Sequence, residues 1–487
     1  MPPAEPALPQ PSRPNRRRAF AMGSAEPRQR PSRCHTAVIH YRPRGKPCSR
    51  TPAVPPEGDT MHISAHLDVD VLALETDDQL CVLVELTAPT ASTRDGDRPA
   101  STLQVVLDRS GSMAGGRLDG AKTALLGLID KLDPGDNFGL VAFDDRVEVA
   151  VAAGPLSDKQ AVKRAIAELD ARGSTDLSAG YLRGLQEAAR IAGPAGATVL
   201  LVSDGHANAG VTDPDTLGGI AAKAHADNIT TSTLGYGLGY DERLMSAIAR
   251  GGAGNEHFAE EADTAGALIA GEVDGLLSQT AQAASLLIQP SPHVRAVQIV
   301  NDLPVTTTGD GLLAELGTFY ADETRKLLIT FDIPAIATLG LTQVATCQFT
   351  WVELPTLAQH TLTVPLHVNV VPGDQAAGRV PDPTVRTELV YLQVQQAKRR
   401  ASGHLSAGAP DAALAELRQA QDALSDALPA APAHLHDDLT EEASALAYLS
   451  DQTQSGMVAR AAKFSSMDAA SKSHKRGRTR PPSSGPN

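Results

Sequence analysis

The stretch LQVVLDRSGSM, residues 103–113, begins as an apolar run and ends in a cluster of polar side chains. Its first five residues, LQVVL, are typical of a strand that is covered on both faces of a sheet. Asp108, Ser110 and Ser112 follow at the carboxyl end of this strand. One carboxylate and two hydroxyls therefore lie together at the mouth of a buried sheet, where they are available to a ligand.

Segments with strand and helix patterns alternate after this stretch. Apolar residues within 118–132 recur on one helical face, and the strand-like runs FGLVAF (138–143), ATVLLVSDG (197–205) and TTSTLGYG (230–237) follow. Between and after them, the sequence predicts helices near 158–171, 178–192, 214–227, 241–250 and 262–280. This alternation predicts an α/β fold with a doubly wound, mostly parallel sheet over residues 100–280. Ligands of such sheets bind beyond the carboxyl ends of the strands, where Asp108 and Asp204 fall.

Three loops at predicted strand ends carry hydroxyls and carboxylates: DRSGS (108–112), GSTDL (173–177) and VSDGHANAG (202–210). Together they offer five hard oxygen donors, Asp108, Ser110, Ser112, Thr175 and Asp204. Mg²⁺, or Mn²⁺, prefers such donors and is usually held by only one or two carboxylates. Neutral hydroxyls leave the ion electron-poor, so it attracts a further carboxylate. The loops therefore predict a metal-mediated socket for an Asp or Glu of a partner protein.

This arrangement resembles the von Willebrand factor A (vWA) domain with its metal-ion-dependent adhesion site. The resemblance covers roughly residues 100–280 and rests on the Asp-x-Ser-x-Ser motif at 108–112, Thr175 in GSTD, and the Asp204-Gly205 pair. It implies that Ser110, Ser112 and Thr175 contact the metal directly or nearly so. By the same resemblance, Asp108 and Asp204 act largely through water. All five positions match the family pattern.

Catalytic interpretations of the same residues have less support. One of the two serines could form a nucleophilic triad with His206 and Asp204, but no G-x-S-x-G elbow surrounds either serine. A phosphatase-like use of Mg²⁺ needs a second metal or a nucleophilic aspartate, for which Asp176 and Asp213 are the nearby carboxylates. No G-x-x-x-x-G-K-[ST] motif is present, so hydrolysis of a nucleotide by a P-loop is unsupported.

Composition limits the class of protein and its compartment. The chain has 487 residues and a formal charge of −14, which argues against a general nucleic-acid binder. No apolar run approaches the roughly 20 residues of a membrane span. The cysteines are widely scattered and form no CxxC pair, which predicts reduced thiols in a cytoplasmic protein; they are Cys34, Cys48, Cys81 and Cys347.

The flanking segments predict further domains. Residues 1–60 are rich in Pro and Arg and should not fold, and patterned sequence begins at Met61, an alternative start of the chain. Alternating runs within 61–99 and short strand-like runs within 281–375 predict a β-sandwich into which the α/β domain is inserted, with Trp351 in its core. Residues 382–465 predict two or three packed helices. The basic, Pro- and Ser-rich residues 466–487 predict a disordered tail.

Together these features predict a non-catalytic, Mg²⁺-dependent protein-interaction module in the bacterial cytoplasm. The alternative is a regulatory or adaptor subunit of a metal chelatase or an AAA+ ATPase complex, in which vWA subunits also occur. A neighbouring ATPase gene favours the adaptor, whereas an isolated gene, or one beside a kinase or phosphatase, favours signalling or scaffolding.

Overall fold

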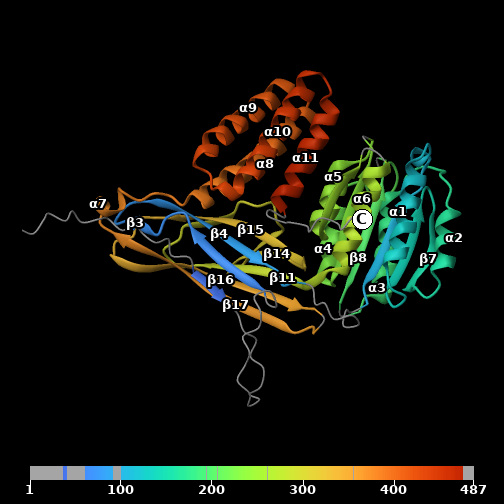
Figure 1. Cartoon of the computed structure of the whole chain (residues 1–487), viewed down its shortest axis with the longest axis horizontal. Coiled ribbons are helices and arrows are strands. Elements are labelled where there is room, and N and C mark those ends of the chain that lie inside the picture. The colour runs from blue at the N-terminus through green and yellow to red at the C-terminus, as the bar shows by residue number, and fades with distance from the viewer. Residues whose placement is uncertain are drawn as a thin grey trace, which may run out of the picture. The chain divides into compact units, whose positions relative to one another are not determined.

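The computed structural model describes residues 37–40, 61–90, 100–193, 195–205, 207–237, 239–259, 262–354 and 356–474. Within these ranges the strands form three sheets (Figure 1). No helix in the same ranges combines the length and the apolar composition that crossing a membrane requires.

The middle part of the chain forms a six-stranded sheet with the order β10-β9-β8-β5-β6-β7. Its strands are β5 (Thr102–Asp108), β6 (Asn137–Phe143), β7 (Val147–Pro155), β8 (Ala197–Ser203), β9 (Ile229–Tyr236) and β10 (Ala253–Ala259). All neighbouring strands run parallel except β7, which pairs antiparallel with β6 at one edge. The predicted α/β fold with a mostly parallel sheet is confirmed.

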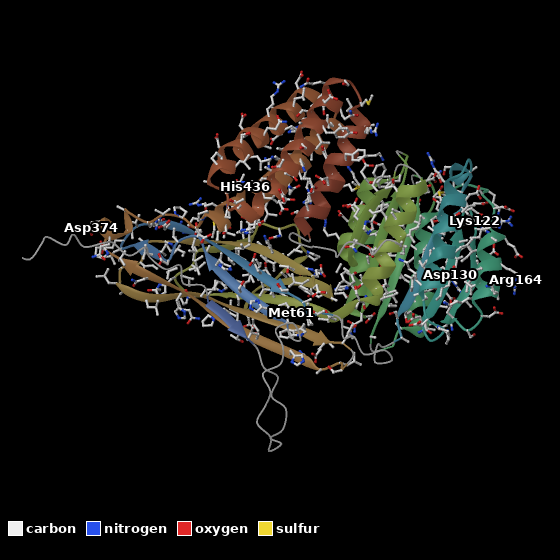
Figure 2. The ribbon with its side chains drawn as sticks, in the orientation of Figure 1. Met61, Lys122, Asp130, Arg164, Asp374 and His436 are labelled. Atoms are coloured by element: carbon white, nitrogen blue, oxygen red, sulfur yellow. The ribbon has the colours of Figure 1, made fainter. Side chains whose placement is uncertain are left out.

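Helices cover both faces of this sheet. On one face lie α1 (Arg117–Lys131), α2 (Lys159–Ala167) and α6 (Ala262–Leu277); on the other lie α3 (Leu177–Ile191), α4 (Pro214–Ala226) and α5 (Glu242–Gly251). Successive side chains of a strand point to opposite faces of the sheet. In β5, Val105 and Leu107 pack against the layer of α1, α2 and α6, and Val106 packs against the layer of α3, α4 and α5. Figure 2 labels Lys122 and Asp130 on α1, in the first layer. The sheet is therefore doubly wound.

Two strands of this sheet have no counterpart among the predicted elements. β7 reads VEVAVAAGP and is largely exposed or half-buried, and β10 reads AGNEHFA, with polar residues at its centre. Both lie at sheet edges, where a strand has one neighbour and needs no long apolar run. The apolar pattern that reveals buried strands is therefore weak in them.

The remaining strands form two sheets with the orders β1-β2-β4-β15-β12 and β13-β14-β11-β16-β17-β3. Their bounds are β1 (Ala37–His40), β2 (His62–Leu67), β3 (Val71–Ala73), β4 (Asp78–Thr87), β11 (Gln279–Pro290), β12 (Ala296–Ile299), β13 (Val305–Thr308), β14 (Gly311–Tyr320), β15 (Thr324–Ile333), β16 (Gly340–Glu353) and β17 (Gln359–Val371). The short helix α7 (Gly373–Ala376) follows β17.

One hydrophobic core joins the segments that precede and follow the α/β part. β4 pairs antiparallel with β15 along its whole length, from Asp78 opposite Ile333 to Thr87 opposite Thr324. Leu80 of β4 and Trp351 of β16 belong to the same core, as does Met61, labelled in Figure 2. Strands that are separated by the whole α/β segment thus bury their side chains together.

Four helices follow: α8 (Pro383–Ser406), α9 (Pro410–Ala427), α10 (His436–Gln454) and α11 (Val458–His474), with short 3₁₀ turns η2 (Leu428–Ala430) and η3 (Ala433–Leu435). Asp382 begins α8 by accepting hydrogen bonds from the backbone N–H groups of Thr384 and Val385. The helices enclose a common apolar core. Inside it, the fully buried Lys398 pairs with Glu442 and Asp468.

Two expectations of disorder need correction. A strand, β1, lies within residues 1–60 and pairs antiparallel with β2; the rest of that segment lies outside the described residues. At the other end, α11 continues past residue 465 to His474. Ala469 is buried in it, and Lys472 pairs with Glu442 at 2.9 Å and with Asp468 at 3.2 Å. Residues 466–474 therefore belong to a folded helix, and residues 475–487 lie outside the described residues.

Because the core is shared, a substitution in a strand that precedes the α/β segment should destabilise the strands that follow it. Leu80→Ala should lower the free energy of unfolding by about 2–5 kcal/mol, because it leaves a cavity in the core that contains Trp351. Trp351 is the single tryptophan, so denaturant unfolding followed by its fluorescence measures this loss directly. The neighbouring exposed Gln79→Ala should change the same value by no more than about 0.5 kcal/mol. An unmoved fluorescence transition in Leu80→Ala would contradict the shared core.

Candidate metal centre

Asp108 ends β5 and is completely buried between the ends of the neighbouring strands. Its Oδ1 accepts a hydrogen bond of 2.7 Å from the backbone N–H of Ser110, and its Oδ2 accepts one of 2.6 Å from the hydroxyl of Ser203, the last residue of β8. Burial raises the pKa of the Asp108 carboxyl, and the nearby charge of Asp204 raises it further, while these hydrogen bonds oppose the change. The Asp108 carboxylate therefore links the ends of β5 and β8, although its burial disfavours the charged form.

The two serines of the motif form a chain of hydroxyls that leads to Asp204. The Oγ atoms of Ser110 and Ser112 lie 3.0 Å apart, and the Ser112 hydroxyl donates to Asp204 Oδ1 at 2.6 Å. Ser110 and Asp204 are buried, whereas Ser112, on the 3₁₀ turn η1 (Gly111–Met113), is exposed. The chain therefore runs from the buried strand end to the surface.

Thr175 joins this group through its loop. The backbone N–H of Gly111 donates to Gly173 O at 3.1 Å, and Asn208 Oδ1 accepts from the Thr175 N–H at 3.3 Å. A methyl group placed on Gly205 would lie 3.3 Å from Thr175 Oγ1 and 3.6 Å from Ser112 Oγ. The two hydroxyls thus converge on Gly205, directly after Asp204. The structure brings together all five predicted residues.

A buried ion-pair network, which was not predicted from the sequence, anchors the loop that carries Thr175. Asp144, immediately after β6, is buried and accepts from Arg109 Nε at 2.9 Å and from Arg172 Nε at 3.1 Å. Burial alone would raise the pKa of Asp144, but the N–H of Arg146 and the two guanidinium groups outweigh it, and the pKa lies below its ordinary value. The available signal was an arginine within the motif itself, at position 109.

Asp204 has a second partner besides Ser112. Arg117, the first residue of α1, places Nη1 2.6 Å from Asp204 Oδ2 and 3.2 Å from the carbonyl oxygen of Ser112. Both oxygens of Asp204 therefore accept hydrogen bonds. Nothing in the sequence pattern indicated this ion pair.

The carboxylates of the phosphatase alternative have structural roles. Asp176 caps α3 by accepting from the backbone N–H of Ala179, and Asp213 caps α4 by accepting from that of Thr216. His206, the histidine of the triad alternative, lies outside the described residues. Both aspartates thus have a structural role as helix caps.

The donor set fits a hard divalent cation. Across the part of the chain that the structure describes, no three or more His, Cys, Asp or Glu side chains gather where they could hold a metal. The candidate centre instead combines two carboxylates with three hydroxyls, and the glycine at position 205 keeps the space between two of those hydroxyls free of a side chain. Mg²⁺ and Mn²⁺ accept such a set, in which few ligands carry charge.

Residues 103–270 match the family model of the von Willebrand factor type A domain. The chain is 30% identical over 252 residues to the uncharacterized protein sll0103 of Synechocystis sp., which covers 50% of this chain and 60% of that protein. It is 31% identical over 197 residues to the uncharacterized protein YfbK of Escherichia coli, covering 40% of this chain and 34% of YfbK. The chain thus spans 60% or less of the length of these two relatives.

Two solved structures resemble the fold over most of the chain. A von Willebrand factor type A protein from Catenulispora acidiphila has a TM-score of 0.66 at 16% identity, covering 88% of this chain and 99% of that one. The ArnB paralog VWA2 from Sulfolobus acidocaldarius has a TM-score of 0.59 at 14% identity, covering 86% and 99%. The likeness of fold therefore extends well beyond residues 103–270.

The raised pKa of Asp108 predicts the sign of a pH effect on stability. The folded protein holds the Asp108 proton to higher pH than the unfolded chain does, so this group costs stability as pH rises above its ordinary value of 3.8. The free energy of unfolding of Asp108→Asn, minus that of the wild type, should therefore increase from pH 3.8 upward and then level off. Urea unfolding in EDTA over a pH series measures this difference.

Asp213→Asn is the control with the opposite sign. Hydrogen bonds from Thr216 lower the pKa of Asp213, so its ionised form stabilises the fold, and this contribution is lost as pH falls through the lowered value. The same difference should therefore become more negative as pH rises toward 3.8 and stay level above that value. A difference for Asp108→Asn that is level above pH 3.8, like that for Asp213→Asn, would contradict the electrostatic account of Asp108.

Proposed function

Because residues 103–270 form a von Willebrand factor type A domain, we propose that this protein binds an acidic side chain of a partner protein through a Mg²⁺ or Mn²⁺ ion held at the Asp108 centre. Domains of this family are generally protein-interaction modules, and they are often metal-dependent. The convergence of the Ser112 and Thr175 hydroxyls beside Asp204 carries the proposal.

Each residue has a defined part in this function. Ser110, Ser112 and Thr175 would hold the cation through neutral hydroxyls. Asp108 and Asp204 would balance its charge, largely through water. A bound divalent cation supplies an open coordination position to which an incoming carboxylate can bind. Ser112 lies on the exposed side of the group, which supports access from the solvent.

The proposal places the module in the cytoplasm and assigns it no catalytic step. Cys81 and Cys347 are free thiols buried in the protein, which suits a reducing compartment. The carboxylates that a second metal or an aspartyl nucleophile would need, Asp176 and Asp213, cap helices instead. These observations favour binding over chemistry at the centre.

Removing one hydroxyl should remove the metal. Thr175→Val keeps the shape of the side chain, so we expect Mg²⁺ affinity to fall more than about tenfold while the melting temperature of the metal-free protein stays close to that of the wild type. Titration calorimetry of the full chain measures the affinity. At physiological metal supply we expect Mg²⁺ or Mn²⁺ rather than Zn²⁺ at the site, because the donors are all oxygen. Thr123→Val on α1, which also removes a threonine hydroxyl, is the matched control and should bind normally. Unchanged binding by Thr175→Val would remove Thr175 from the site.

The partner's carboxylate should carry much of the binding energy. Partners retained from lysate by the full chain in Mg²⁺ should be lost in EDTA and in Thr175→Val. Replacing the bound Asp or Glu of an identified partner by Ala should cost about 2–4 kcal/mol, which is about thirty-fold to nearly a thousand-fold in Kd. Partner binding that is unchanged both in EDTA and in Thr175→Val would exclude the metal-mediated contact. The partner would then bind to the C-terminal helices or to the other two sheets.

A further inference from the structure

We propose that Arg117 is a built-in competitor of the cation at this centre: its guanidinium group pairs with Asp204 and lowers the affinity of the site for a divalent ion. The inference rests on the proposed function for the position of the cation site. It assigns to this arginine a role in setting how readily the site fills.

The contacts of Arg117 place its charge inside the donor set. Nη1 lies 2.6 Å from Asp204 Oδ2 and 3.2 Å from the main-chain oxygen of Ser112. The other oxygen of Asp204 accepts the Ser112 hydroxyl at 2.6 Å. A cation that draws on Asp204 therefore has to weaken an existing ion pair, and it meets the repulsion of a full positive charge.

The position of Arg117 is not explained by the needs of its helix. It is the first residue of α1, where the partial positive charge of the helix N-terminus disfavours a cation. The preceding residue at the N-cap, Gly116, has φ of 105° and no side chain that could cap the helix. The positive charge of Arg117 is therefore stabilised by the carboxylate of Asp204 and not by its own helix.

A second loop leaves space for the guanidinium group. Gly237, directly after β9, has φ of 78°, and a methyl group placed on it would lie 3.0 Å from Arg117 Nη2 and 3.1 Å from Cζ. The Arg117 side chain is 40% exposed, so one side of it faces the solvent. A long side chain with an open side can leave Asp204 by rotation about its own bonds, without a change in the fold.

Competition and a purely structural role predict opposite changes in Mg²⁺ affinity when Arg117 is removed. If Arg117 only supported the loops, its loss would weaken both the fold and the binding of Mg²⁺. If it competes, its loss weakens the metal-free protein but tightens Mg²⁺ binding, because removing a counter-ion of Asp204 frees that carboxylate for the cation. The two readouts therefore move in opposite directions.

The test compares Arg117→Gln with the wild-type full chain by calorimetric titration with Mg²⁺. We expect the variant to bind Mg²⁺ roughly tenfold more tightly, and Arg117→Lys to lie near the wild type, since it retains the charge. Arg183→Gln is the matched control: Arg183 is 44% exposed on α3 and pairs with Glu187 at 2.6 Å. It should leave the Mg²⁺ affinity unchanged. In EDTA, Arg117→Gln should melt a few degrees below the wild type, as expected for loss of an ion pair to a buried carboxylate.

Each outcome decides the matter. Equal or weaker Mg²⁺ binding by Arg117→Gln, with wild-type binding intact, would overturn the competition while leaving the proposed function in place. If the wild type binds no Mg²⁺ but Arg117→Gln does, the arginine silences the site, and the proposed function fails while this inference stands. If neither binds, both are overturned.

Discussion

The buried carboxylate of Asp108 is the constraint on which the candidate centre depends. It accepts hydrogen bonds from Ser203 at the end of β8 and from the N–H of Ser110 in its own loop, so two neighbouring strands end in a fixed relation. A buried charge is costly, and the raised pKa of Asp108 expresses that cost. The hydrogen bonds compensate part of it, and a bound cation would compensate more.

Parallel strand order supplies the rest of the arrangement. Because β5 lies between β6 and β8, the residues that follow these three strands meet at one edge of the sheet. Asp204 follows β8 directly and Asp144 follows β6, where Arg109 and Arg172 anchor the loop that carries Thr175. The hydroxyls of Ser110, Ser112 and Thr175 are thus positioned by loops that the strand order brings together.

The central sheet and the five donors were predictable because each rests on a local pattern. LQVVLD has the continuous apolar run of a strand covered on both faces, and the polar residues follow at its end. The edge strand AGNEHFA has no such run, and helix α11 is rich in Ala and Ser with few large apolar side chains, so neither is marked by a strong apolar periodicity. The ion pair between Arg117 and Asp204 joins residues that are far apart in the sequence and needs the folded loops to be seen. The role of the five donors as metal ligands, and the division of the chain into domains, stay predictions.

The most direct test of a cation at the Asp108 centre is an anomalous diffraction measurement on crystals of the full chain grown with Mn²⁺. The account predicts one strong anomalous peak bounded by the hydroxyls of Ser110, Ser112 and Thr175, at metal–oxygen distances near those of Mg²⁺ sites, roughly 2.0–2.2 Å. A map with no peak there, or with its strongest peak at another group of oxygens, would contradict the account.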